Sequence, residues 1–451
     1  MRGCLLYTFL FGALGSVPVY LPLFFYNEGA LTGFQTGVLL AARPFVSAIS
    51  SPALGIAADR WRGHNGMLFV GALVAVTATA AMLHADGRFG VLLGLCICAS
   101  VGMSAVVPIV DSAMVSLARL AWGRLRLWGA VGFGLAALAS GALLEVTHRA
   151  WAPLMLLYAA LMTVAVAMAF TLDLSGDGKE GTVRMHSNAV EGEAVPTCAA
   201  NEEETHSLPR PRIAHRDAFL EHFFCAFKPL ATLGSILVGG IGAGAIDGFL
   251  YVFLVEELDA PPLLLGLSRL LTCVSELPVF HLGERLMSLL GTSGMLALSM
   301  VTYCVRMLWY AGMGVFKVSP WVVLPAEVLH GITFACLWIS ATQWARATAP
   351  PGRETSAQGL VEGVHWGMGQ GLGCLVGGLI YGATGGVVLW LGSAGLAVVG
   401  LILSIIGAER GVEVGERTVN SLLGYSPLEM AELSPAPDPT AESIECELAT
   451  P

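Results

Sequence analysis

Ten ionisable side chains stand inside long apolar segments of this sequence, where a charge is hardest to accommodate. They are Arg43, Asp111, Asp247, Arg269, Glu276, Arg306, Glu327, His330, Glu362 and His365. If those segments cross a bilayer, a charge near its centre costs roughly 2.5–3.5 kcal/mol unless it finds a partner or water. So many buried ionisable groups therefore predict a hydrated cavity between membrane helices.

The spacing of two of these residues suggests a proton-binding carboxylate. Arg269 and Glu276 are seven residues apart, which places them on one helix face about two turns from each other. We expect Glu276 to face the cavity beside Arg306, which would keep the carboxylate ionised until solute or movement separated them. The alternative is a structural tie between neighbouring helices.

Two acid and histidine pairs are spaced so that each pair lies on one helix face. Glu327 with His330 and Glu362 with His365 are three residues apart. Such a pair can share a proton, because histidine titrates near physiological pH, although a helix histidine is equally compatible with packing. We assign to proton coupling Asp247, Glu276, Arg306, Glu327 and His330. We assign to the substrate cavity Arg43, Asp111, Arg269, Glu362 and His365.

The elements that must position these residues are membrane helices. The 451 residues are 55% hydrophobic and only 12% charged, with a mean hydropathy of +0.72, and a bilayer core needs about 20 apolar residues per helix. Runs of that length recur, and they are too long and too uniform for a β-barrel. We predict spans near 4–26, 33–58, 65–83, 91–117, 127–147, 151–172, 226–255, 262–283, 292–316, 320–345, 356–382 and 385–406.

This pattern predicts an all-α membrane protein of twelve transmembrane helices in two six-helix bundles. Residues 1–172 form the N-terminal bundle and 226–407 the C-terminal bundle. Between and after them lie a polar linker, 173–225, and an acidic tail, 408–451, both predicted to be disordered. These two segments hold an excess of acids that accounts for the net charge of −10, so the acidity says nothing about a cationic ligand.

The halves also share a pattern that suggests an internal duplication. Arg43 and Pro52 in the second span are nine residues apart, as are Arg269 and Pro278 in the eighth. An acid followed by arginine closes both spans. Repeats of this kind are common in transporters, with the binding site at the interface between the halves.

Basic residues predict the orientation. With the N-terminus in the cytoplasm, ten arginines fall on that side: Arg2, Arg60, Arg62, Arg119, Arg124, Arg126, Arg285, Arg346, Arg353 and Arg410. Three basic residues fall on the other: Arg88, Arg149 and Lys317. We therefore expect both termini in the cytoplasm.

Two further patterns concern packing and recognition. Glycines in the eleventh span form two rows at four-residue steps, Gly359 to Gly371 and Gly369 to Gly377, which favour close helix contact. Six aromatic residues could stack on a planar or sugar-like solute, although aromatics in membrane helices more often pack or face lipid: Tyr20, Tyr26, Phe249, Tyr251, Trp338 and Trp366.

Several functions lack their usual signatures. The ten cysteines are scattered without a CxxC, and no histidines stand at metal-ligand spacing, so we expect no metal and no disulfide. No phosphate-binding loop or nucleophile triad is present, so we expect neither an enzyme nor a cofactor. Energy for transport would come from an ion gradient or from the gradient of the solute.

One segment resembles a known signature. GIAADRWRG, residues 55–63, is similar to the GxxxDRxGRR motif of the major facilitator superfamily, without its closing double arginine. The resemblance implies that Asp59, with Arg60, lies at a cytoplasmic gate, where the carboxylate faces the N-terminus of the eleventh helix and is stabilised by the helix dipole.

Longer stretches resemble one branch of that superfamily. GRLRLWGAVGFG (123–134), EVLHGITFACLW (327–338) and SAQGLVEGVHWGMGQGLGCLVGG (356–378) are similar to the branch containing the animal major facilitator superfamily domain-containing protein six. Related bacterial proteins resemble lactose permease and nucleoside/proton symporters. In the permease pattern, helices 7 to 10 carry an acid, a glutamate, an arginine and a His/Glu pair, and Asp247, Glu276, Arg306 and Glu327 with His330 stand on the same helices, the last pair in reversed order.

These observations predict a secondary active transporter that moves a small organic solute with protons by alternating access. We expect a monomer in a lipid bilayer, with no nucleic-acid partner. Two alternatives stay open: an uncoupled facilitator, and a non-transporting receptor or scaffold, a role also proposed for animal members of the branch. The short outward loops favour transport over the receptor.

Overall fold

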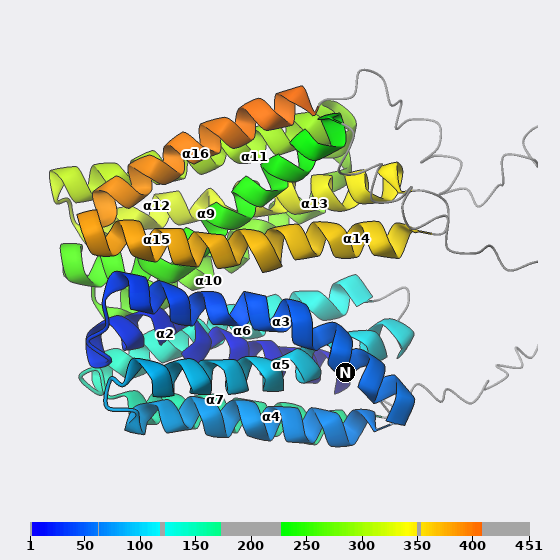
Figure 1. Cartoon of the computed structure of the whole chain (residues 1–451), viewed down its shortest axis with the longest axis vertical. Coiled ribbons are helices and arrows are strands. Elements are labelled where there is room, and N and C mark those ends of the chain that lie inside the picture. The colour runs from blue at the N-terminus through cyan, green and yellow to red at the C-terminus, as the bar shows by residue number, and fades with distance from the viewer. Residues whose placement is uncertain (1, 62, 118–121, 173–226, 350–352, 408–451) are drawn as a thin grey trace, which may run out of the picture.

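The computed structural model describes residues 2–61, 63–117, 122–172, 227–349 and 353–407. The predicted linker and acidic tail lie outside the described residues. The described part of the chain is helical, without strands. Figure 1 shows the helices in two groups, one from each half of the chain.

The first half supplies six long helical segments. Their elements are α1 (Arg2–Gly15), α2 (Val17–Leu23), η1 (Phe24–Glu28), α3 (Gly33–Trp61), α4 (His64–Ala81), η2 (Met82–His84), α5 (Phe89–Leu117), α6 (Trp122–Val146) and α7 (Trp151–Phe170). The first segment is one membrane span in three pieces, because Pro18 and Pro22 each remove a backbone donor and η1 is a π-helix.

The second half supplies six more segments. Their elements are α9 (Phe227–Leu258), α10 (Pro262–His281), α11 (Gly283–Phe316), η3 (Pro320–Val322), α12 (Val323–Val328), α13 (His330–Thr348), α14 (Glu354–Glu362), η4 (Gly363–Gly369), α15 (Gln370–Thr384) and α16 (Gly386–Ile406). The tenth span breaks at Leu329, and the π-helix η4 interrupts the eleventh.

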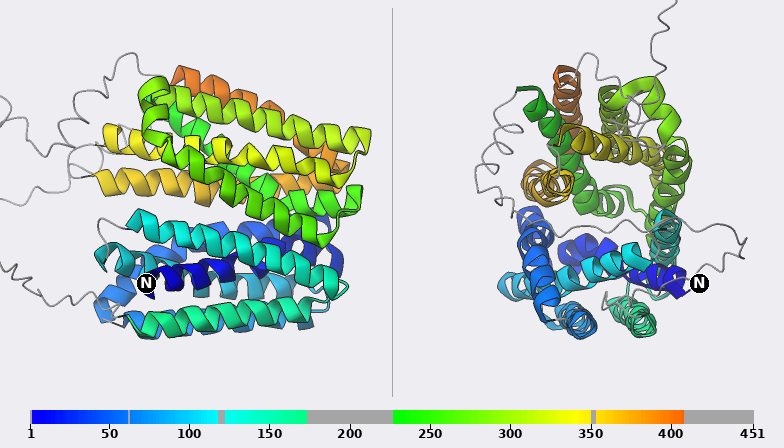
Figure 2. Two further views of the ribbon diagram at one scale, coloured as in Figure 1. Left: turned by 180° about the vertical axis from the view of Figure 1, so that it is seen from behind. Right: turned by 90° about the vertical axis from the view of Figure 1, so that its right-hand side faces the viewer.

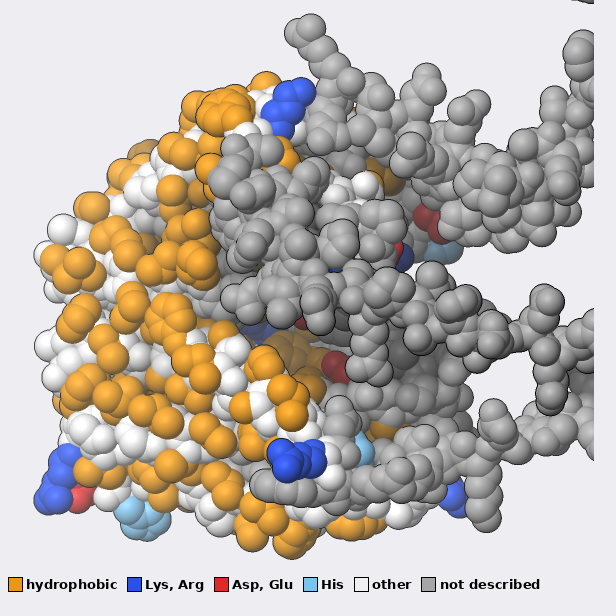
Figure 3. Space-filling view, turned by 45° about the vertical axis from the view of Figure 1, so that its right-hand side comes forward, with side chains coloured by type: hydrophobic (Ala, Val, Ile, Leu, Met, Phe, Trp, Pro, Cys, Tyr) orange, Lys and Arg blue, Asp and Glu red, His pale blue; other side chains and the backbone are white. Residues whose placement is uncertain are grey.

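The predicted fold is confirmed. Eleven helical segments of the described chain are long and apolar enough to cross a membrane, and residues 354–384 form a twelfth, more polar one. Figure 2, in its right-hand view, shows the helices as an N-terminal and a C-terminal group. Hydrophobic side chains dominate the described outer surface in Figure 3, as expected of a surface that faces lipid.

The two bundles touch mainly along two seams, α3 against α15 and α6 against α10, with a smaller contact of α2 with α9. In the first seam the backbones nearly meet, because a Cβ added to Gly33 would lie 2.7 Å from the Cα of Gly382. In the second, a Cβ on Gly141 would lie 3.2 Å from the backbone nitrogen of Gly266. Both seams lie toward the end of the molecule away from the N-terminus.

A hydrogen bond between the bundles reinforces the second seam. The Glu145 carboxylate, near the end of α6, accepts a hydrogen bond of 3.0 Å from the backbone N–H of Leu263, in the first turn of α10. A carboxylate is favoured there because the first N–H groups of a helix have no partner within it and carry the positive end of its dipole.

The opposite end, where the N-terminus lies, is open. A Cβ added to Gly55 of α3, or to Gly359 or Gly363 of the eleventh helix, would meet nothing within 4 Å, and Ile49 and Ile56 of α3 are 78% and 69% exposed. In Figure 3 a hollow with charged side chains separates the two halves on this side. The structure is closed at one end and open at the other.

The two glycine rows therefore have different roles. Packing is confirmed for the second row, since Gly369, Gly373 and Gly377 lie against α9. In the first row, Gly367 and Gly371 contact α3, whereas Gly359 and Gly363 border the opening. Close packing explains only the half of the first row that belongs to the closed seam.

Substitution of Gly33 by valine should prevent α3 and α15 from forming their contact at the closed end. The added side chain collides with the backbone at Gly382, so α3 and α15 must separate. We expect thiol labelling of a cysteine placed at Leu31, in the loop before α3, to rise in the protein reconstituted into liposomes. Gly94→Val is the control, because a Cβ at Gly94 of α5 meets nothing within 4 Å. Equal labelling in both variants would contradict this role of the seam.

Candidate functional site

A buried ion pair forms the centre of the C-terminal bundle. Arg306 of α11 and Glu327 of α12 are 1% and 2% exposed, and Nη2 of Arg306 lies 3.3 Å from Oε2 of Glu327. Tyr310, one turn after Arg306, donates its hydroxyl proton to Oε1 of Glu327 and accepts a hydrogen bond of 2.9 Å from Nη2 of Arg306. Every charge in this group has a partner, as its burial requires.

His330 extends this group towards the cavity. Its Nδ1 lies 3.2 Å from Nη1 of Arg306, and its Nε2 lies 3.1 Å from Oε1 of Glu276 on α10. Arginine can only donate, so Nδ1 must accept and Nε2 carries the proton that is donated to Glu276. His330 is thus a neutral link between a guanidinium and a carboxylate. Glu276 and His330 are 21% and 22% exposed, so this end of the series reaches the cavity.

The resulting series corrects two predicted pairings. Glu276 contacts His330 instead of Arg306 directly, because the break of the tenth span at Leu329 places the imidazole between α10 and α11. Glu327 and His330 do not form an isolated pair either, since both contact Arg306. The four predicted residues form one series: Glu327, Arg306, His330 and Glu276.

A second ion pair borders the cavity. Nη2 of Arg269 lies 2.8 Å from Oδ1 of Asp247, and the amide of Gln370 donates a 3.1 Å hydrogen bond to Oδ2. The Arg269 guanidinium also lies 6.0 Å from the centre of the Tyr251 ring. The two charged side chains are 18% and 36% exposed. They are therefore paired, but accessible to water.

Arg43 brings a charge from the N-terminal bundle to the same region. Its side chain is exposed, yet it lies deep enough in the protein to interact electrostatically with Asp247 and Tyr158. Exposure of a deeply placed side chain is what a water-filled cavity produces. Arg43 and Arg269, the two arginines of the predicted repeat, both lie near Asp247.

The remaining predicted residues lie apart from this centre. Asp111 of α5 accepts a 2.6 Å hydrogen bond from Tyr7 of α1, within the N-terminal bundle. Glu362 is exposed at the end of α14, whereas His365 is buried in η4, with Nδ1 3.3 Å from the carbonyl oxygen of Ile236. The predicted shared face of Glu362 and His365 is therefore wrong: one side chain meets water and the other is enclosed.

The predicted gate is only partly described. Asp59 and Arg60 belong to the last turn of α3 at the open end, and Arg60 is exposed. The side chain of Asp59 lies outside what the structure describes. Its predicted contact with the eleventh helix stays a prediction.

Two polar residues of the centre were missing from the sequence predictions, Tyr310 and Gln370. A tyrosine four residues after Arg306 lies on the same helix face, a spacing that signals the contact. For Gln370 no such signal exists, because it reaches Asp247 from a helix 123 residues away in the chain.

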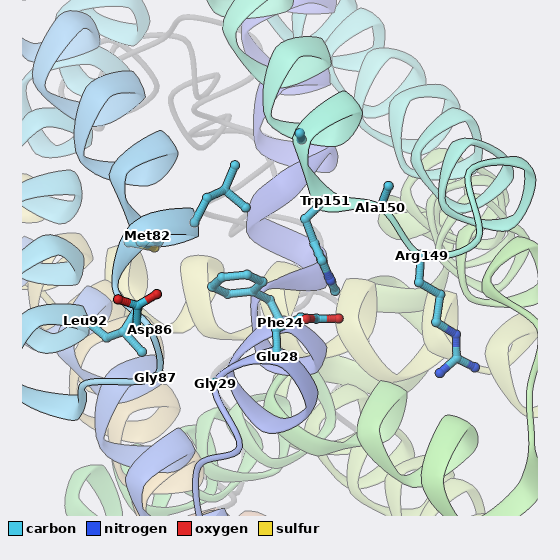
Figure 4. Close-up of a pocket in the computed structure, with 12 residues that line it drawn as sticks. Phe24, Glu28, Gly29, Met82, Asp86, Gly87, Leu92, Arg149, Ala150 and Trp151 are labelled. Carbon is cyan, nitrogen blue, oxygen red and sulfur yellow. The ribbon is translucent and has the colours of Figure 1, made fainter.

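A separate cavity of about 490 Å³ opens at the closed end of the N-terminal bundle. Figure 4 shows Phe24 and Glu28 of the first segment, Asp86 of the α4–α5 connection, Arg149 of the α6–α7 connection and Trp151 at the start of α7 around it. None of these residues belongs to the charged centre.

Comparison with known proteins assigns the family. A model of the MFS_1 like family matches residues 2–391. The chain belongs to this family of the major facilitator superfamily. It is an integral, multi-pass membrane transporter, as the resemblance in the sequence predicted.

Relatives of this superfamily member support the assignment. The maltose permease of Geobacillus stearothermophilus is 26% identical over 415 residues, 91% of this chain and 95% of the permease. The major facilitator superfamily domain-containing protein 6-like of Danio rerio is 30% identical over 161 residues, only 29% of its own length. A mutant of the nucleoside transporter NupG has the same fold, with a TM-score of 0.72 at 16% identity, over 90% of this chain and 99% of NupG.

Removing one partner of the buried ion pair should destabilise this transporter more than removing one partner of the cavity pair. Arg306→Met leaves Glu327 charged and enclosed, which costs about 3–5 kcal/mol. Arg269→Met leaves Asp247 where water can solvate it. We expect the midpoint of thermal unfolding, followed by tryptophan fluorescence in detergent, to fall further for Arg306→Met. The double variant Arg306→Met with Glu327→Leu should recover stability, and equal losses in the two single variants would refute the contrast.

Proposed function

We propose that this transporter is a proton-coupled symporter of a small organic solute and that Glu276 takes up the proton. The observation that carries the proposal is the hydrogen-bonded series from the buried Glu327 through Arg306 and His330 to Glu276, with a carboxylate at each end. The carboxylate at its enclosed end is held by Arg306 and Tyr310, while its cavity end is reached by water.

Charge explains why the carboxylate at the cavity end would be the one that exchanges protons. Glu327 is neutralised by Arg306 and also receives the Tyr310 hydroxyl, so its negative charge is satisfied. Glu276 receives one hydrogen bond, from a neutral imidazole. A proton on Glu276 would remove a charge that otherwise must be desolvated when the cavity closes.

Alternating access then links the proton to the solute. The bundles rock about the site between them, so that the open end closes and the two seams part. Closure at the open end brings Arg43 of one bundle nearer the Asp247–Arg269 pair of the other. We infer that bound solute and a protonated Glu276 together make this closure favourable, since each replaces water around a polar group.

The solute belongs to the small, polar organic molecules. The relatives named above are a maltose permease and a nucleoside transporter, and a POT family transporter solved with 5-aminolevulinic acid has the same fold at a TM-score of 0.65. We propose that both termini and the open end face the cytoplasm, on the strength of the ten arginines against three basic residues on the other side.

Glu276→Gln should separate transport from proton coupling. Glutamine keeps the size and accepts the hydrogen bond from His330 but cannot exchange a proton. In liposomes tested with maltose, adenosine and a dipeptide, we expect exchange of the transported solute within about twofold of wild type. The variant should no longer concentrate solute against its concentration gradient. In wild type, a pH difference of one unit can drive at most about tenfold accumulation if one proton moves with each solute.

Glu284→Gln is the matched control, because Glu284 is exposed at the start of α11 and makes no part of the series. It should accumulate solute as wild type does. If Glu276→Gln still concentrated solute in response to a pH gradient, the assignment of the proton site would be wrong. If wild type exchanged solute but never concentrated it, the chain would be an uncoupled facilitator.

A further inference from the structure

A cluster of rings lies beside the charged series at the open end of the C-terminal bundle. On α13, His330, Phe334 and Trp338 are four residues apart and their rings are nearly parallel: His330 and Phe334 are 5.8 Å apart at 9°, and Phe334 and Trp338 are 6.2 Å apart at 15°. Trp366 of η4 meets Phe334 at 5.8 Å and Trp338 at 5.9 Å, inclined by about 60° to both. The rings form a corner with two apolar faces.

The corner faces the space between the bundles. Phe280 of α10 also contacts Phe334, so the rings connect α10, α13 and η4. Two of these three elements contact the other bundle: α10 packs on α6, and η4 packs on α3. The rings of α10, α13 and η4 therefore meet beside the space between the bundles. Trp366 and Phe280 are 36% and 38% exposed. Large apolar surface is therefore presented to a cavity whose other walls are charged.

A buried polar atom in the cluster lacks a partner. His365 is 2% exposed and lies edge-on to Trp366, with ring centres 4.7 Å apart. Its Nδ1 faces the Ile236 carbonyl, which can only accept, so Nδ1 carries the proton and Nε2 is an acceptor. That Nε2 has no hydrogen-bond partner. An unpaired buried acceptor is costly and is relieved when a donor reaches it.

The backbone beside the rings is unusual as well. His365 and Trp366 lie in the π-helix η4. Such turns are rare in proteins, and those that occur are often found at functional sites. The extra residue of a π-turn rotates the side chains that follow it. Here it separates the exposed Glu362 from the enclosed His365 and places Trp366 against α13.

We propose that Trp366, Phe334 and Trp338 form a stacking site for a flat-faced ring of the transported solute and that Nε2 of His365 accepts a hydrogen bond from a donor on its rim. The inference rests on the proposed function and specifies its substrate class. Two kinds of solute share this chemistry, nucleosides with an aromatic base and sugars with an apolar ring face. Stacking on aromatic side chains depends little on the chemical identity of the flat ring.

The site also explains how solute binding reaches the proton site. His330 is the first ring of the stack and the only one that contacts Glu276 among the described residues. A solute ring stacked on Phe334 therefore contacts a residue that packs directly on His330, the hydrogen-bond partner of Glu276. Movement of His330 would change the environment of that carboxylate directly.

The test is equilibrium binding of labelled adenosine, maltose and dialanine to the protein in lipid nanodiscs. Trp366→Leu and Phe334→Leu should weaken binding of the ring solute that wild type prefers by about tenfold, while Trp366→Phe should stay within about threefold of wild type. His365→Asn, which can still donate to Ile236 but lacks Nε2, should also weaken it about tenfold. Trp321→Leu is the control, because Trp321 is 46% exposed in η3 at the far end.

The possible results separate this inference from the proposed function. Unchanged adenosine or maltose affinity in Trp366→Leu and Phe334→Leu overturns the stacking site and leaves proton coupling intact. Preference of wild type for dialanine overturns it too. Binding of none of the three overturns the stacking site as well, whereas the proposed function is overturned only when a transported solute is not concentrated by a pH gradient. If the thermal midpoint shows that Trp366→Leu unfolds, the affinities of Trp366→Phe and His365→Asn decide whether the stacking site exists. Affinity close to wild type in the first and about tenfold weaker in the second supports the site, and equal affinities overturn it.

Discussion

The cost of placing charge in a medium that cannot solvate it governs this structure. Arg306 and Glu327 are almost fully enclosed, and they are accommodated because both terminal nitrogens of the guanidinium are hydrogen-bonded and the carboxylate is held by Arg306 and the Tyr310 hydroxyl, although Nε of Arg306 has no partner. Glu276, with a single hydrogen bond from His330, and Asp247, which is paired with Arg269 and Gln370, are instead reached by water. The gradient from complete pairing to hydration defines the cavity, and the remainder of the C-terminal bundle is arranged around it.

The same constraint explains how two bundles can part without exposing charge to lipid. Charged groups line the space between the bundles, while glycines lie against backbone where the seams approach most closely, as at Gly33 with Gly382 and Gly141 with Gly266. The contact of Glu145 with the first turn of α10 uses unpaired N–H groups that exist in any helix. Both features favour separation of the interface at little energetic cost, which the proposed alternating access requires.

The sequence predicted the fold well because its signals are local. Apolar run length predicts the spans, and eleven of the twelve were found within about five residues at each end, apart from the breaks at Leu329 and η4. The ninth helix begins at Gly283 instead of 292, with non-helical backbone at Gly291. The identity of the ionisable residues was equally visible, since a charge in an apolar run stands out. Their partners were harder, because Glu276 and His330 are 54 residues apart in the chain and meet only through packing. The pairing of Glu362 with His365 was wrong because helical spacing does not hold across a π-turn.

The central claim is that Glu276 carries the proton that accompanies the solute. The most direct measurement is the pH inside liposomes, reported by an enclosed dye, when solute is added outside without any imposed gradient. The account predicts that the lumen acidifies as solute enters through wild-type protein and that Glu276→Gln admits solute without acidification. Acidification of equal size in both proteins would contradict it.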